Sequence, residues 1–285
     1  MSHTIVVSHY RENLDWLWTL PDDITKVIIY HKGDRLDLIP KNHPMVEVHT
    51  LPNIGREGHT ILYHILANYN NWQTSVKNKE ENTKNNKKDK DNEKIDRVTF
   101  VQGNPLEHSP YLINLFRVVN DWKPAQELGY QFDQSTPPPH VLQYFKNKGC
   151  ESVLLGIDWN ANHYLPSRWV DSGITYLQSK YNKQYNKRGI RVHPKGIIMD
   201  FLTRCGVIGI CPDLATHEMI PMTYGGQFSV EITQILKRPI KLYQKLVEGL
   251  FITRDTQGGL EGYILERCWM LLFTDKDMIQ KMIKY

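Results

Sequence analysis

The residues best placed to hold a ligand follow one apolar run in the first half of the chain. Val98–Val101 is β-branched and aromatic and stops at Gly103-Asn104-Pro105, a pattern typical of a buried strand that ends in a polar loop. In open α/β sheets, ligands bind just beyond the carboxyl ends of such strands. The polar and titratable side chains presented there are Gln102, Asn104, Glu107 and His108. We therefore expect this loop to line a binding site.

Three earlier apolar runs predict the elements that position this loop. Thr4–Ser8, Lys26–Tyr30 and Met45–His49 each have the composition of a buried parallel strand. A short amphipathic helix is expected at Leu14–Trp18, and Gly58–Tyr69 has the apolar spacing of a longer helix. Strands that alternate with helices predict an α/β fold, with a mostly parallel, doubly wound central sheet flanked by helices.

The later part of the chain predicts further elements of the same domain. They are strands at Ser152–Gly156 and Met222–Val230, and helices at Thr233–Phe251, with a break near Pro239, and at Gly262–Phe273. No flexible linker divides the chain, so we expect a single domain over residues 1–285. Residues 76–97 are the exception. They form a Lys/Asn/Glu/Asp tract with few apolar side chains, which predicts a disordered, low-complexity insertion.

Composition narrows the class of protein. A formal net charge of +4 in 285 residues, without a strongly basic patch, gives no reason to expect a nucleic-acid partner. The four cysteines show no C-x-x-C spacing, which favours buried, reduced thiols in a cytoplasmic compartment. Neither a signal peptide nor a membrane-spanning run of about 18 apolar residues is expected.

The common catalytic motifs are missing from the sequence. It contains no H-E-x-x-H zinc motif, so its twelve histidines are better interpreted as structural than as metal ligands. It also lacks the G-x-S-x-G nucleophile elbow, the G-x-G-x-x-G dinucleotide fingerprint and the P-loop. An unrelated α/β hydrolase is therefore the weakest of the functional hypotheses.

The first 110 residues or so resemble glycosyltransferases of the GT-A type, the nucleotide-diphospho-sugar transferases. Ile5–Glu12 resembles their first strand and its Tyr-Asn-Glu-like loop, and Val27–Asp34 resembles their second strand with its acidic, Gly-containing turn near the nucleoside. Asn53–Thr60 resembles the Asn-x-Gly loop and helix start after their third strand. The whole chain, including Gly225–Phe228 and Gly262–Trp269, also resembles a domain family of unknown function.

The GT-A resemblance implies a nucleotide-binding half at about residues 1–120 and an acceptor half at about 140–285. It implies a nucleotide-sugar donor and a glycan or glycoprotein acceptor as partners. The donor-binding residues that it implies are Tyr10, Glu12, His31, Asp34, Asn53, Arg56, Gln102, Asn104 and His108.

The sequence departs from the GT-A pattern at the metal site. Where the family has Asp-x-Asp to hold a metal and the sugar diphosphate, this chain has Gln102-Gly103-Asn104. Amide oxygens carry no charge and would hold Mn²⁺ or Mg²⁺ weakly. Either a cation neutralises the diphosphate without a metal, or another carboxylate such as Glu107 or Asp158 enters the site. Arg56, near an expected helix start, is the preferred cation, with a surface or capping role as the alternative.

Transfer with inversion needs a carboxylate that takes the proton of the acceptor hydroxyl. Glu266, in an apolar helix, is the candidate base, and a structural pair with Arg267 is the alternative. Asp158 is a second candidate catalytic carboxylate, with Trp159 beside it to stack on a sugar, although a capping Asp beside a core Trp fits as well. Gly226 and Gln227 complete the expected acceptor site. A carbohydrate- or nucleotide-binding protein without catalysis is the rival hypothesis, favoured by Gln102 and Asn104.

Overall fold

The computed structural model describes residues 3–22, 24–85, 96–105, 179–183, 194–216, 227–251 and 259–273. In this part of the chain, five strands form one sheet in the order β3-β2-β1-β4-β5. Pairs β1–β2, β1–β4 and β2–β3 are parallel, and β5 runs antiparallel to β4. The prediction of an α/β fold with a mostly parallel sheet is confirmed.

The elements follow one another along the chain as strands, short 3-10 helices (η) and α-helices. Up to β4 they are β1 (His3–His9), η1 (Asp15–Thr19), β2 (Lys26–His31), η2 (Leu36–Leu38), β3 (Val46–Thr50), α1 (Arg56–Asn85) and β4 (Arg97–Gln102). After it come α5 (Pro194–Arg204), α6 (Val207–Ile210), η7 (Pro212–Thr216), β5 (Phe228–Glu231), α7 (Ile232–Leu236), α8 (Ile240–Leu250), α9 (Gly259–Glu266) and α10 (Trp269–Phe273).

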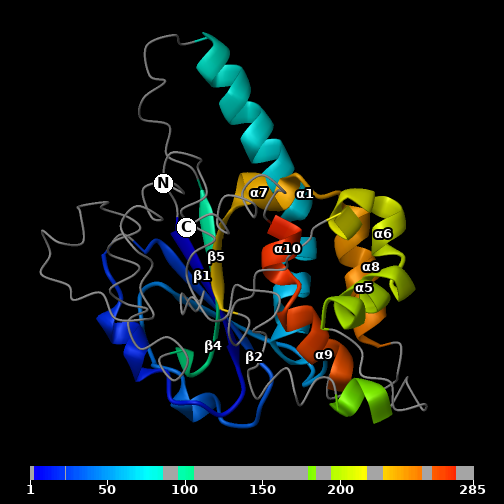
Figure 1. Ribbon diagram of the computed structural model, residues 1–285. Coiled ribbons are helices and arrows are strands. Elements are labelled where there is room, and N and C mark those ends of the chain that lie inside the picture. The colour runs from blue at the N-terminus through cyan, green and yellow to red at the C-terminus, as the bar shows by residue number, and fades with distance from the viewer. Residues whose placement is uncertain are drawn as a thin grey trace, which may run out of the picture.

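Alternation along the strands divides the core between the two faces of the sheet. Val6, Ile28 and Phe100 belong to a cluster with α1 and the α5–α10 helices, which we call the helical face. Ile5 and Val7 belong to a smaller cluster covered by η1 and η2, which we call the thin face. In Figure 1, α5, α8, α9 and α10 lie to one side of the sheet and the short blue helices lie to the other.

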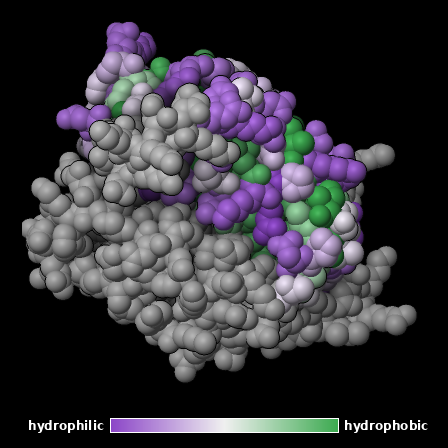
Figure 2. Space-filling model, turned by 90° about the horizontal axis from the view of Figure 1, so that it is seen from above, coloured by the Kyte–Doolittle hydropathy of each residue, from purple (hydrophilic) through white to green (hydrophobic). Residues whose placement is uncertain are grey.

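Helix α1 is longer than the sequence predicts. It begins at Arg56 and continues to Asn85, so residues 76–85 are helical where disorder was expected. Lys, Glu and Gln are good helix formers, and extending a helix whose first half is already packed costs little. Figure 1 shows α1 projecting beyond the body, and most of the described surface seen from above is hydrophilic (Figure 2).

Each of the two helices predicted near the end of the chain is divided into two in the structure. Pro239 separates α7 from α8, as expected from its fixed φ and missing N–H. The single helix predicted at Gly262–Phe273 is two helices, α9 and α10, with Arg267 and Cys268 between them. Of the strand predicted at Met222–Val230, the structure describes Gln227 onward and places β5 at Phe228–Glu231. The strand predicted at Ser152–Gly156 lies outside the described residues.

Candidate functional site

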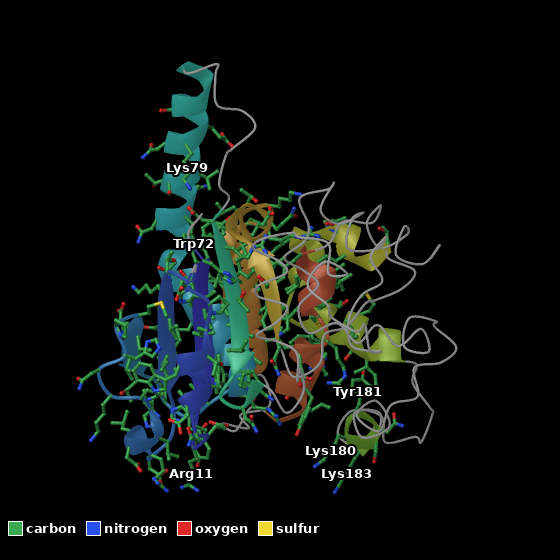
Figure 3. All side chains as sticks on the ribbon, turned by 90° about the vertical axis from the view of Figure 1, so that its left-hand side faces the viewer. Arg11, Trp72, Lys79, Lys180, Tyr181 and Lys183 are labelled. Carbon is green, nitrogen blue, oxygen red and sulfur yellow. The ribbon has the colours of Figure 1, made fainter. Side chains whose placement is uncertain are left out.

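The parallel strands bring four loops to one edge of the sheet. The chain leaves β1 toward β2, while β4 pairs with β1 on the opposite side, so the carboxyl ends of β1 and β4 flank the topological switch point. This is the place where open α/β sheets bind ligands. In Figure 3, Arg11, which follows β1, lies at the lower end of the sheet, whereas Lys79 lies far away on the projecting end of α1.

Glu12 and Gly103 close the gap between the loops after β1 and β4. The Glu12 carboxylate accepts hydrogen bonds from the backbone N–H groups of Tyr10 (2.7 Å) and Arg11 (3.0 Å). A Cβ at position 103 would overlap that carboxylate and lie 2.7 Å from its Cδ, so only glycine permits this approach. The indole N–H of Trp16 also donates to the Gly103 carbonyl at 3.0 Å. The two loops therefore meet through a fixed carboxylate.

Arg11 and Asp34 join the loops after β1 and β2. The guanidinium donates from two nitrogens to the two carboxylate oxygens, at 2.7 and 2.8 Å. These hydrogen bonds lower the pKa of Asp34, although both side chains are exposed. Arg11 also lies over the Tyr10 ring, 5.0 Å from its centroid. The side chains of Tyr10, Arg11 and Asp34 thus form one connected group at this edge of the sheet.

A pair of buried histidines lies at the ends of β1 and β2. The Nδ1 atoms of His9 and His31 are 2.9 Å apart, and His9 Nε2 lies 2.9 Å from the Glu12 carbonyl oxygen. A carbonyl only accepts, so neutral His9 must carry its proton on Nε2 and accept at Nδ1. His31 then donates from Nδ1 to His9. Burial lowers the pKa of His9, which favours its neutral form.

Lys32 fixes the turn that precedes α1. Its buried ammonium donates to the backbone carbonyls of Ile54 (2.6 Å) and Arg56 (2.5 Å). Gly55 and Arg56 both have left-handed backbones, with φ of 61° and 51°. A left-handed arginine is uncommon, and the two lysine hydrogen bonds help to hold it. Burial lowers the pKa of Lys32 to about 8.

Arg56 and Glu266 come together at the start of α1. The Arg56 guanidinium lies over the ring of Tyr263, 4.2 Å from its centroid, in a cation–π contact. Glu57 and Glu266 both interact electrostatically with Arg56. Glu266 lies 3.9 Å from an Arg267 nitrogen, and its side chain is 19% exposed. Glu266 thus has Arg267 as a neighbour just after the end of α9 and also interacts with Arg56, so both the catalytic and the structural interpretation stay open.

The remaining predicted residues are less closely connected. Gln102 donates to the carbonyl of Asn104 within the same loop (3.3 Å), and Asn53 is exposed in the loop after β3. Gln227 is fully buried and donates to the Pro105 carbonyl at 3.3 Å, while its Oε1 has no hydrogen-bond partner among the described residues. Five residues named from the sequence lie outside the described residues: Glu107, His108, Asp158, Trp159 and Gly226.

Four residues that the sequence did not single out shape the site: His9, Trp16, Lys32 and Tyr263. His9 was detectable, because it ends β1 as His31 ends β2 and lies on the same side of the strand. The contacts of Trp16 and Tyr263 join segments far apart in sequence, so no local pattern indicates them.

Comparison with protein-family models, with curated proteins and with solved structures finds no match to this chain. Among the described residues, no group of three or more His, Cys, Asp and Glu side chains is arranged to hold a metal ion. None of the helices in this part of the chain combines the length and apolarity needed to span a bilayer.

Proposed function

We propose that the chain is a glycosyltransferase of GT-A type that uses a nucleotide-sugar donor and neutralises the donor diphosphate with Arg56. One observation carries the proposal. A partly buried arginine is held over Tyr263 at the N-terminus of a 30-residue helix, beside the carboxyl edge of a mostly parallel sheet. A helix N-terminus and a fixed guanidinium both favour phosphate oxygens.

The proposed reaction needs one bond to break and one to form. The bond between the sugar C1 and the diphosphate oxygen breaks, and the diphosphate leaves with its charge against Arg56. An acceptor hydroxyl forms the new bond to C1 and loses its proton to the Glu266 carboxylate. Glu266 supports this role because it interacts electrostatically with Arg56 and is neither fully exposed nor fully buried.

The loops after β1 and β2 would receive the nucleoside. The Arg11–Asp34 ion pair joins these two loops, and the Glu12–Gly103 contact joins the loop after β1 to the loop after β4. His31 donates from Nδ1 to His9, so its Nε2 remains for a hydrogen bond with a ligand. These groups would recognise the nucleoside by hydrogen bonds, whereas Arg56 would bind the diphosphate.

A thermal-shift screen with uridine and guanosine diphosphates and their sugar conjugates, with and without Mn²⁺, tests the proposal. We expect one diphosphate to raise the melting temperature without metal. Arg56→Ala should weaken its binding at least about tenfold. Lys245→Ala is the matched control, because this exposed cation pairs with Glu248 on α8, and it should leave binding unchanged. A screen with no diphosphate-dependent shift would overturn the proposal.

A second measurement separates catalysis from binding alone. Glu266→Gln should retain diphosphate binding but lose transfer of the sugar to acceptor or water, whereas the exposed Glu248→Gln should retain both. The rival function, binding without catalysis, is favoured by one observation: Gln102 stands where a carboxylate is expected and donates within its own loop. Diphosphate binding without donor turnover in the unmodified protein would favour that rival.

A further inference from the structure

A shallow pocket lies between η1 and η2, on the thin face beside the loops after β1 and β2. Its volume is about 380 Å³, within the range of small-molecule sites. Trp18 lines it together with polar side chains from both loops, among them Asn13, Asp15, Asp37 and Lys41. None of these residues belongs to the proposed donor site.

Trp18 is the unusual member of this pocket. Its neighbours Leu14 and Leu17 are completely buried in the thin-face core, yet Trp18 is 57% exposed. Its ring contacts that of His43, with centroids 4.4 Å apart, and buried His43 faces the Leu17 carbonyl oxygen at 3.3 Å. The indole is therefore supported from one side, and its exposed surface offers a flat apolar platform.

The charges around the pocket compensate one another. Arg35 donates to both oxygens of Asp37, at 2.8 and 2.7 Å, and these hydrogen bonds lower the pKa of Asp37 to about 2. Asn13 donates to Asp15 at 2.9 Å, and Lys41 supplies a further positive charge. Two carboxylates and two cations leave no net charge. The pocket thus has no electrostatic preference for a cation or an anion.

We infer that this pocket binds a neutral carbohydrate. A sugar presents an apolar C–H face that can lie on the Trp18 ring and hydroxyl groups that both donate and accept. Paired carboxylates still have lone pairs for sugar hydroxyls, and Lys41 and Asn13 can donate. A charged ligand would gain nothing from the balanced charges, and a purely apolar ligand would leave the polar wall without partners. The inference does not depend on the proposed transferase activity.

Saturation-transfer NMR and tryptophan fluorescence titrations of the full chain test the inference. The probes are methyl glucoside, methyl galactoside, methyl mannoside and N-acetylglucosamine, with tetramethylammonium as the cationic probe. We expect at least one sugar to bind with a millimolar dissociation constant. Trp18→Ala should weaken that binding at least about tenfold, and Asp37→Asn should weaken it less. Because Trp18 is exposed, its replacement should leave the melting temperature unchanged.

Two controls separate this pocket from other surfaces. Tyr63→Ala removes an exposed aromatic residue of α1 and should leave sugar binding unchanged. Arg56→Ala disables the proposed donor site and should also leave sugar binding at the Trp18 pocket unchanged. The two proposals can therefore fail independently. The inference is overturned if no sugar saturates, if Trp18→Ala binds sugar as tightly as the unmodified chain, or if tetramethylammonium alone binds in a Trp18-dependent manner.

Discussion

The two faces of the sheet differ greatly in what covers them. Among the described residues, the cluster on the helical face contains 34 buried side chains, drawn from the sheet and from α1 and α5–α10. The cluster on the thin face contains nine, covered by two 3-10 helices of five and three residues. Within the described part of the chain, the helical face therefore has most of the apolar burial, which is the main source of folding free energy.

Because of this difference, we expect the helical face to contribute more to stability and the thin face to offer more side chains for binding. The short helices of the thin face cannot cover much surface, so loop side chains remain exposed there and can meet ligands. The pocket lined by Trp18 lies between the two short helices that cover this face. Arg56 and Glu266, in contrast, are held by helices of the helical face. The candidate donor site thus combines residues on helices of the helical face with residues on the loops after β1 and β2.

The largest expected effect comes from the same truncation on each face. Leu246 in α8 and Leu17 in η1 are both completely buried. Leu246→Ala should lower the free energy of unfolding by about 3–5 kcal/mol, because closely packed helices prevent the cavity from collapsing. Leu17→Ala should cost less, about 2–3 kcal/mol, because η1 can move inward. Urea denaturation measures both values, and equal losses would contradict the proposed difference between the faces.

The pH dependence of stability is the next effect in size. His64 lies on the buried side of α1 and accepts a hydrogen bond from Tyr30 at 3.0 Å. Burial, with smaller effects of the Lys26 and His49 charges, lowers its pKa from 6.5 to about 4. Between these values the unfolded chain takes up a proton that the folded chain does not. Stability is therefore complete above pH 6.5 and falls as the pH drops toward 4, by at most about 3 kcal/mol from His64.

Unfolding measured at several pH values checks this expectation. The double variant Tyr30→Phe/His64→Leu removes the titrating group together with its hydrogen-bond partner, so no buried hydroxyl is left unsatisfied. Between pH 6.5 and 4, the free energy of unfolding of this variant should change less than that of the unmodified chain. Tyr30→Phe alone is the control, because it keeps His64 in its buried place. An unchanged pH profile in the double variant would show that His64 does not carry the effect.

The sequence predicts the sheet well because the strands have strong local signals. Thr4–Ser8, Lys26–Tyr30, Met45–His49 and Val98–Val101 all correspond to strands that differ from the prediction by a residue or so at either end. Each is a continuous apolar or alternating run that ends at a turn residue, so its signal lies within the strand itself. The break at Pro239 is equally local.

The candidate site is predicted less completely, for a physical reason. Residues at strand ends were found because all parallel strands deliver their loops to one edge. Arg56 and Glu266 were each named, but the cation–π contact through Tyr263 spans some 200 residues and has no local pattern. The helix over residues 76–85 was missed because composition indicates disorder, whereas the packed first half of α1 provides the nucleus.

The smallest expected effect concerns the contact between Glu12 and Gly103, which joins the loops after β1 and β4. Gly103→Ala places a Cβ against the Glu12 carboxylate, which can move only by giving up its hydrogen bonds to Tyr10 and Arg11. We expect a loss of about 1–3 kcal/mol in the free energy of unfolding. Glu12→Ala removes the obstacle, so the double variant Gly103→Ala/Glu12→Ala should lose less than the sum of the single variants.

Denaturation of the two single variants and the double variant gives this coupling directly. A double variant that loses less than the sum would show that the Glu12 carboxylate lies directly against position 103, because removing the carboxylate relieves the strain that the new methyl group creates. Strictly additive losses would show instead that the Glu12 carboxylate is not what opposes a methyl group at position 103.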